Sequence, residues 1–193
     1  MVKVLAIGAH IDDIELGCGG TLLKHCVAGD QITLAIIKID DALGGNPDQR
    51  IQEQDAAAVK VNASWLGFHG DNSIEKIVGV LDAVKPDLIY FPYEKDHHQD
   101  HHRAFQVGMA IGRNPECDLR GYLVTTSYGY VPDYFSIIDI AFKKSLVRCF
   151  KSQVTRKKRY MDLMVNHSRF FGTLVSEEGV FAEGFVTYRK VWR

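Results

Sequence analysis

The chain alternates short apolar runs with stretches of helical pattern, and this order constrains the fold more than any other feature. Residues 2–8 form a continuous apolar run of the kind found in strands buried on both faces. Similar runs predict strands at residues 32–39, 64–68 and 88–91, and helical patterns lie between them at residues 14–28, 49–61 and 73–84. Strands that alternate with helices form a mostly parallel sheet covered on both faces. We therefore predict an α/β fold in three layers.

The second half of the chain carries weaker signals of the same kind. We expect helices at residues 104–112 and 143–167, the latter long and basic, and strands at residues 122–126, 135–140 and 180–192. The sequence shows no linker, repeat or low-complexity segment. A single domain over residues 1–193 is the simplest interpretation.

Charge and apolar content exclude several classes of protein. Lys and Arg number 23 against 24 Asp and Glu, a net charge of −1, so the surplus of cations needed to bind nucleic acid is missing. Apolar runs stay well below the roughly 20 residues of a membrane span, and residues 2–8 are too short for a secretion signal. The four cysteines contain no Cys-x-x-Cys pair, which disfavours a cysteine zinc site. We expect a cytoplasmic protein without nucleic-acid partners or an integral membrane segment.

The first cluster of chemically capable side chains follows the first strand, at Gly8-Ala9-His10-Ile11-Asp12-Asp13. A dinucleotide-binding turn would need a second glycine where His10 stands. Imidazole and carboxylate groups are instead suited to zinc, and of two adjacent aspartates one can bind metal while the other acts as a general base. The structural alternative is that Asp12 or Asp13 caps the next helix and His10 is a hydrogen-bonded loop residue.

The second cluster lies at residues 96–102, after the strand expected at 88–91, and holds four of the 8 histidines. In the common strand order 3-2-1-4-5, strands 1 and 4 are neighbours and ligands bind in the crevice between their carboxyl ends. His10 and Asp13 would then face residues 98–101. Two histidines, one carboxylate and an open position describe a catalytic zinc. The alternative is a solvated polar loop or an incidental metal-binding tract.

Together these motifs resemble the PIG-L/LmbE-like family of zinc-dependent N-deacetylases. The motifs that carry the resemblance are His10-Ile11-Asp12-Asp13, where Ile11 replaces the family's usual proline, Gly17-Cys18-Gly19-Gly20-Thr21, Arg50-Ile51-Gln52-Glu53, Leu66-Gly67, Asp96-His97-His98-Gln99-Asp100-His101 and Ala182-Glu183-Gly184-Phe185. The resemblance is weakest over residues 112–170. It implies a Rossmann-like, doubly wound α/β/α fold and an enzyme that removes acetate from an N-acetylated amino sugar, as free sugar, sugar nucleotide or glycoconjugate.

The resemblance also implies roles for individual residues. His10, Asp13 and His101 would hold one zinc ion per chain, and Asp12 would be the general base. His98 would polarise the acetyl carbonyl or protonate the leaving amine, with Asp100 orienting an imidazole. Arg50 and Asp96 would contact substrate. A shift of one residue in the second motif would replace His98 or His101 by His97 or His102. A homo-oligomer is compatible with these features.

Two other classes of protein remain as alternatives. Metallo-β-lactamase-like hydrolases bind two zinc ions through His-x-His-x-Asp-His, and this chain departs from that motif at Asp96 and has only His167 downstream as a further histidine ligand. A non-catalytic metal- or nucleotide-binding module is the second alternative.

Weaker signals lie outside the two motifs. The loop from Asp40 and Asp41 to Asp48 is a candidate to bind sugar hydroxyls. The tyrosines that follow the strand expected at residues 122–126 are candidates to line the rim of the pocket: Tyr128, Tyr130 and Tyr134. We interpret the basic run at residues 156–159 as an exposed helix face rather than a phosphate clamp, and His25, His69 and His167 as structural.

Overall fold

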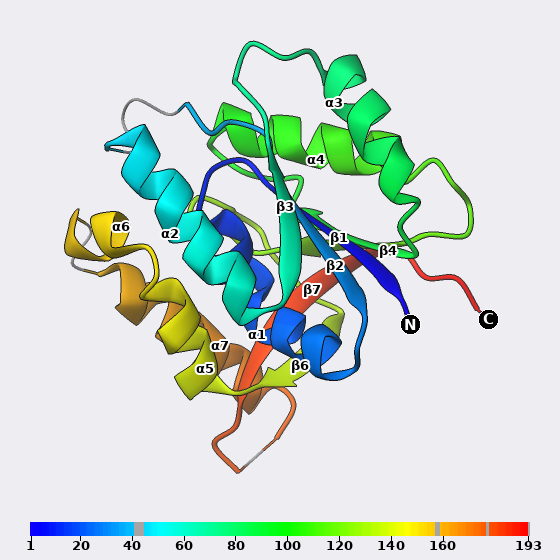
Figure 1. The fold of residues 1–193 in the computed structure, drawn as a ribbon. Helices are drawn as coiled ribbons and strands as arrows, with labels where there is room; N and C mark the ends of the chain where they lie inside the picture. The colour runs from blue at the N-terminus through cyan, green and yellow to red at the C-terminus, as the bar shows by residue number, and fades with distance from the viewer. Residues whose placement is uncertain (41–44, 157–158, 177, 193) are drawn as a thin grey trace.

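A computed structural model describes residues 1–40, 45–156, 159–176 and 178–192 (Figure 1). Seven strands form one sheet in the order β3-β2-β1-β4-β5-β7-β6. Their bounds are β1 (Lys3–Gly8), β2 (Gln31–Ile36), β3 (Ala63–Gly67), β4 (Leu88–Pro92), β5 (Asp118–Tyr122), β6 (Tyr134–Ile138) and β7 (Phe181–Arg189). The first five strands pair in parallel, and β7 runs antiparallel between β5 and β6. The predicted mostly parallel sheet is confirmed.

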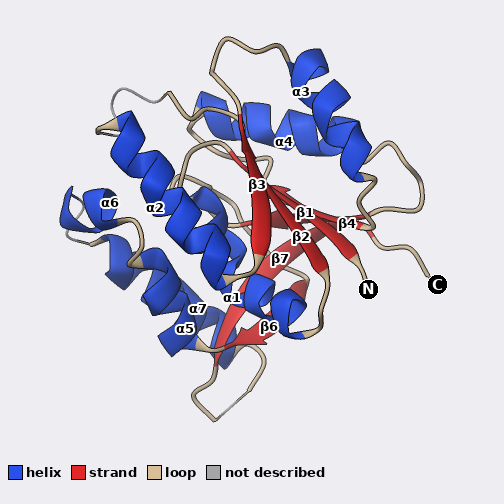
Figure 2. Cartoon of the chain, viewed as in Figure 1, coloured by secondary structure: helices blue, strands red, loops and turns tan. Residues whose placement is uncertain are grey.

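Helices cover both faces of the sheet (Figure 2). Helices α3 (Ile74–Leu81) and α4 (Gln99–Ile111) lie on one face. On the other lie α1 (Asp13–Val27), α2 (Pro47–Lys60), α5 (Ile140–Val147), α6 (Lys151–Arg156) and α7 (Tyr160–Thr173). A separate apolar cluster fills each interface. The three-layer doubly wound architecture is therefore confirmed. Within the described ranges no helix is long and apolar enough to span a membrane.

The order in which strands are added to the sheet reverses at β1: β2 and β3 lie on one side of it, and β4 and β5 lie on the other. Strand β1 pairs with β2 on one side and with β4 on the other. After β1 the chain enters α1 on one face, and after β4 it enters α4 on the opposite face (Figure 2). The loops that leave these two strands therefore diverge and leave a crevice at their carboxyl ends, where doubly wound folds bind ligands.

Two sequence features of the resemblance have a packing explanation. A Cβ on Gly17 would lie 2.1 Å from Cδ2 of Tyr122, so only glycine lets α1 approach β5 this closely. The carboxylate of Glu183, on β7, accepts hydrogen bonds from the backbone N–H groups of Gly20 and Thr21 at 2.8 Å, and from Nζ of Lys143 at 2.6 Å. Glu183 thus ties the antiparallel strand to α1 and α5.

The expected single helix at residues 143–167 is wrong, because α5, α6 and α7 occupy this region. The chain turns after α5, where Phe150 is fully buried. Beyond the turn, the backbone N–H and the hydroxyl of Ser152 donate to the carboxylate of Glu53 at 2.8 and 2.7 Å. These contacts with α2 hold the chain out of a continuous helix. Lys157 and Lys158, in the basic run, lie outside the described residues.

The strand expected at residues 122–126 is displaced. Strand β5 ends at Tyr122, because its pairing partner β4 ends at the matching residue, Pro92. Beyond it the backbone N–H of Val124 donates to the hydroxyl of Ser127 at 3.2 Å, which turns the chain. The sequence pattern places this strand four residues too late, although it predicts its presence.

Candidate metal and active site

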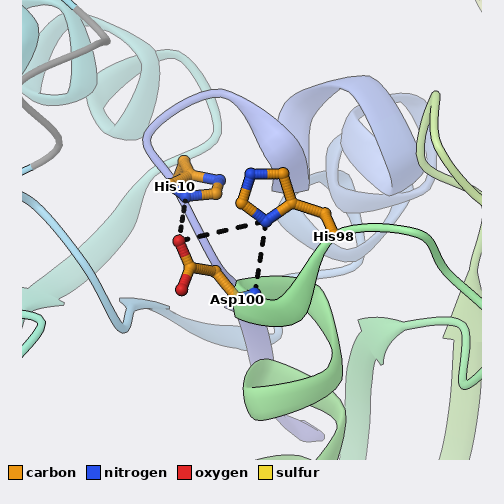
Figure 3. Close-up of side chains that lie close together, drawn as sticks. All are labelled: His10, His98 and Asp100. Atoms are coloured by element: carbon orange, nitrogen blue, oxygen red, sulfur yellow. Dashed lines mark hydrogen bonds and ion pairs between the residues drawn. The ribbon is translucent and has the colours of Figure 1, made fainter.

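The carboxyl ends of β1 and β4 bring the two motifs together. Nε2 of His10, after β1, lies 3.0 Å from Oδ2 of Asp100, after β4 (Figure 3). The rings of His10 and His101 have centroids 5.6 Å apart. The convergence expected from the strand order is thus present in the structure.

The loop after β1 separates the two adjacent aspartates. Asp12 has φ +104°, a left-handed conformation that residues other than glycine rarely adopt, and α1 begins at Asp13. Oδ2 of Asp13 accepts the backbone N–H of His10 at 2.8 Å. Oδ2 of Asp12 lies instead 3.7 Å from Nη2 of Arg50. The two carboxylates therefore serve different neighbours.

Helix α4 begins at Gln99, five residues before the expected helix, because His98 caps it. Nδ1 of His98 accepts the backbone N–H of Asp100 at 3.2 Å. This cap places Asp100 and His101 in the first turn of the helix, at the mouth of the crevice. Since Nδ1 accepts a hydrogen bond, the proton of the neutral His98 ring lies on Nε2.

Two groups of side chains among the described residues have ligand atoms within 4.8 Å of one another. The inner group is His10, Asp13 and His101, and the outer group is His10, His98 and Asp100. In the inner group, Oδ2 of Asp13 lies 3.6 Å from Nδ1 of His10 and 3.5 Å from Nε2 of His101. In the outer group, His10 presents its other nitrogen, Nε2.

The inner group has the support that metal sites in proteins need. Each of its imidazoles turns its second nitrogen to a carboxylate: Nε2 of His10 to Asp100, and Nδ1 of His101 to Oδ1 of Asp96 at 3.0 Å. Such carboxylates fix the orientation of histidine ligands and raise their basicity. Two imidazole nitrogens and one carboxylate oxygen are also the donors zinc prefers at catalytic sites. The residues of the inner group therefore fit a zinc ion.

Electrostatics within the inner group follow from burial and close charges. Burial alone would lower the pKa of His101, but the charges and hydrogen bonds of Asp13 and Asp96 raise it to about 10. Burial alone would raise the pKa of Asp13, but His101 and His10 hold it well below its usual range. The pKa of His98 is lowered by burial and by its histidine neighbours, so its ring is neutral near pH 7.

Asp12 lies in a buried environment between two other side chains. Arg50, on α2, is 4% exposed and donates from Nη2 to the carbonyl oxygen of Ile11, beside its ion pair with Asp12. Tyr160, on α7, has a pKa raised well above its usual value by burial and then by the nearby charge of Asp12. Arg50 thus holds the Asp12 loop as well as lining the crevice.

The buried position of Asp96 argues against the expected contact with substrate. The side chain of Asp96 has no exposed surface. Its oxygens accept hydrogen bonds from the hydroxyls of Thr126 and Ser127 at 2.6 and 3.0 Å, and from the backbone N–H of His98 at 2.8 Å. Together with its contact to His101, these bonds occupy the carboxylate. Asp96 therefore lies behind the site and orients His101.

A cavity of about 360 Å³ opens over both groups. The predicted residues in its wall are His10, Asp12, Asp13, Arg50, His98, Asp100 and His101. Lys38, Gln153 and Tyr160 also line it, although no motif indicated them, and so does Arg156 of the basic run that we interpreted as an exposed helix face. Lys38 follows β2 at the same sheet edge, so its strand-end position was a usable signal. The other three come from α6 and α7, which the sequence pattern had merged into one helix.

Several candidate residues lie away from the cavity. His97 and His102 belong to neither group. The ring of His97 stacks on the ring of Tyr128, with the two centroids 4.6 Å apart. Asp40 accepts the backbone N–H of Gly70 at 2.8 Å, whereas Asp41 lies outside the described residues. Tyr130 and Tyr134 are also absent from the cavity wall. The downstream histidine, His167, lines a different cavity.

The fold is a doubly wound α/β sheet, and a His/Asp/His group that could hold a cation lies at the switch point of its strand order. Residues 5–111, more than half of the chain, match the family GlcNAc-PI de-N-acetylase (PIG-L). The chain belongs to this family.

Individual relatives differ in reaction. The uncharacterized deacetylase YaiS of Escherichia coli (strain K12) is 24% identical, covering 73% of this chain and 89% of that protein. The N,N'-diacetylchitobiose deacetylase of Pyrococcus horikoshii shares the fold at TM-score 0.77 and 20% identity, covering 96% of this chain and 84% of the other. The 4-carboxy-2-hydroxymuconate hydratase GalB of Pseudomonas putida KT2440 shares it at TM-score 0.81 and 17% identity, covering 100% and 98%. The reaction must therefore be argued from the site.

Proposed function

We propose that this protein is a zinc-dependent N-deacetylase that hydrolyses the acetamide of an N-acetylated amino sugar and releases acetate. The observation that carries the proposal is the inner group, His10, Asp13 and His101, with the separate carboxylate of Asp12 beside it. Membership of a de-N-acetylase family supports the reaction, and the chitobiose deacetylase among the structural relatives supports a sugar substrate.

One zinc ion per chain is proposed, held by the inner group. When bound, zinc supplies a Lewis acid that polarises an amide carbonyl and lowers the pKa of water to about 7. Three protein ligands would leave the fourth position of a tetrahedral zinc to water or substrate, and the cavity gives a substrate access to the inner group. Asp100 and Asp96 hold the two imidazoles in the orientation that ligation requires.

The remaining roles follow from hydrogen-bond geometry. Asp12 accepts the proton of the attacking water, and the guanidinium of Arg50 lies 3.7 Å from its Oδ2 and holds the carboxylate in place. His98 has its proton on Nε2 because Nδ1 caps α4, so it donates a hydrogen bond to the developing oxyanion. The departing amine takes the proton that Asp12 received from the water, because the neutral His98 ring would become an imidazolate if it gave up its own. Arg50 contacts substrate at the cavity wall and positions Asp12.

Acetate release from a panel of N-acetylated sugars tests this proposal. The protein is stripped of metal, reloaded with one equivalent of zinc and assayed on free, nucleotide-linked and glycoside-linked N-acetylglucosamine. The hydration substrate of GalB is assayed in parallel, because that relative shares the fold. Zinc-dependent acetate release supports the proposal. Hydration without acetate release, or zinc binding without turnover of any substrate, would contradict it.

Matched variants separate the base from the ligands. Asp12→Asn should retain zinc and lose about 100-fold or more in turnover, the scale of a general base. His101→Ala should lose zinc, whereas His102→Ala, the exposed neighbour on the same helix, should keep both zinc and activity. Full activity in Asp12→Asn would remove the proposed base, and full zinc occupancy in His101→Ala would remove that ligand.

A further inference from the structure

The outer group, His10, His98 and Asp100, is a second place where a cation can be held. Figure 3 shows His98 and His10 both directed toward the carboxylate of Asp100. Oδ2 of Asp100 lies 3.0 Å from Nε2 of His10 and 3.9 Å from Nδ1 of His98. Two imidazoles and a carboxylate are the same donor set as in the inner group. The two groups share only His10, through different nitrogens.

A cation of the protein itself already sits at the outer group. Nζ of Lys38 lies 2.9 Å from Oδ2 of Asp100, the oxygen that the outer group would offer to a metal. The ammonium supplies a positive charge where a second divalent ion would have to bind. The Lys38 side chain is 30% exposed and forms part of the cavity wall, so solvent and a competing ion reach the ammonium.

We propose that the outer group is a second, weaker divalent-metal site that the Lys38 ammonium keeps closed, so that the protein works with one metal ion and is inhibited by a second. The inference rests on the proposed zinc at the inner group for its effect on activity, but the second site is defined by its own ligands. A second ion would bind Oδ2 of Asp100 and Nε2 of His10, and would thereby remove the contact that orients this zinc ligand.

Several contacts make this site weaker than the inner group. An ion on Nδ1 of His98 replaces the hydrogen bond from the backbone N–H of Asp100. An ion on Nε2 of His10 replaces the hydrogen bond to Asp100 and, with zinc already on Nδ1, must also displace the ring proton to solvent. It also lies at the amino end of α4, where the helix dipole disfavours a cation. Displacement of Lys38 adds to these costs. The second ion therefore binds only when metal is in excess.

Zinc stoichiometry measured without substrate tests the proposal. The wild type, Lys38→Met and Lys38→Arg are dialysed against increasing free zinc, and bound zinc is measured by atomic absorption. Lys38→Met removes the ammonium and keeps the stem, so its second zinc should bind at about tenfold lower free zinc than in the wild type. Lys38→Arg keeps the charge and should match the wild type. Deacetylase activity, where present, should fall as the second zinc binds.

His98→Ala gives a test that does not depend on the Lys38 variants. It should abolish the second zinc while the first remains, in both the wild-type and the Lys38→Met background. The proposal is overturned if Lys38→Met and wild type have superimposable isotherms, or if the second zinc survives His98→Ala. A protein that binds no zinc at the inner group, or that deacetylates nothing, would refute the proposed function alone, since the Lys38-dependent binding step is counted separately.

Discussion

Asp96 offers the sharpest test of how the site is built, because its carboxylate is buried behind a proposed ligand. It accepts hydrogen bonds from His98, Thr126 and Ser127, and its Oδ1 lies 3.0 Å from Nδ1 of His101. Asp96→Asn keeps the shape of the side chain and removes its charge. Its one oxygen can still accept from the groups that face Oδ1, which belong to His98, Thr126 and His101. The fold should survive, and the change should act on His101.

The expected magnitude follows from these contacts. Loss of a carboxylate behind a histidine ligand typically lowers metal affinity about 10- to 100-fold, which is about 1.4–2.7 kcal/mol. Asp96→Ala differs, because it also leaves several buried donors without an acceptor and should destabilise the fold by about 3–5 kcal/mol. The two substitutions therefore separate an effect on the metal from an effect on the fold.

Zinc affinity is measured by competition with a chelator, and stability by urea unfolding of the metal-free protein. Asp82→Asn, an exposed aspartate at the opposite end of the sheet, is the control. Unchanged zinc affinity in Asp96→Asn would refute the orienting role. A raised KM with unchanged zinc affinity would instead restore the direct substrate contact that the buried side chain argues against.

The carboxylates of Asp13 and Asp96 beside His101 predict that zinc affinity rises with pH. Asp13 and Asp96 outweigh burial and raise the pKa of His101 to about 10, so the metal-free protein carries a protonated His101 at pH 7. Zinc must displace that proton, so its apparent affinity should rise at least about tenfold per pH unit between pH 6 and 8, and more steeply where His10, whose pKa Asp13 and Asp100 raise against burial, is also protonated. Calorimetry in buffers of different ionisation enthalpy counts the protons released. An affinity independent of pH would contradict the electrostatic argument, and Asp96→Asn should weaken the dependence.

Two further predictions concern the packing of α1. Gly17→Ala places a methyl group 2.1 Å from the Tyr122 ring and should cost about 3 kcal/mol or more in urea unfolding, whereas Gly79→Ala, which meets nothing within 4 Å, should be neutral or stabilising; equal stabilities would show that α1 can move away from the sheet. Lys143→Ala leaves the Glu183 carboxylate buried without its ammonium and should cost about 3–5 kcal/mol, and adding Glu183→Gln should recover part of it. An additive loss in the double variant would contradict the pairing.

The first half of the fold could be predicted because its signals are local. The apolar run at residues 88–91 predicts β4, which the structure has at Leu88–Pro92. The helical pattern at residues 49–61 predicts α2, which the structure has at Pro47–Lys60. The breaks in the expected helix at 143–167 could not be predicted, since Ser152 reaches Glu53 across 99 positions of sequence. No local periodicity encodes a contact of that range.

The site shows a similar division. Strand order alone predicts that His10 meets residues 98–101, and the structure brings them together. The direction of a side chain is a different kind of information. Asp96 shares a motif with His101 but points away from the cavity, and Lys38 had no motif yet forms an ion pair with Asp100. Pairing geometry decides both, and a motif does not record it.

The left-handed backbone of Asp12 has a consequence for how this protein can change over time. A non-glycine residue at φ +104° carries about 1–3 kcal/mol of strain, which glycine at the same position would relieve. Glycine would also remove the carboxylate beside the buried guanidinium of Arg50, and loss of one partner of a buried ion pair costs about 3–5 kcal/mol. The ion pair with Arg50 therefore outweighs the strain, so selection for heat resistance alone should keep an acidic residue at position 12 in spite of its backbone.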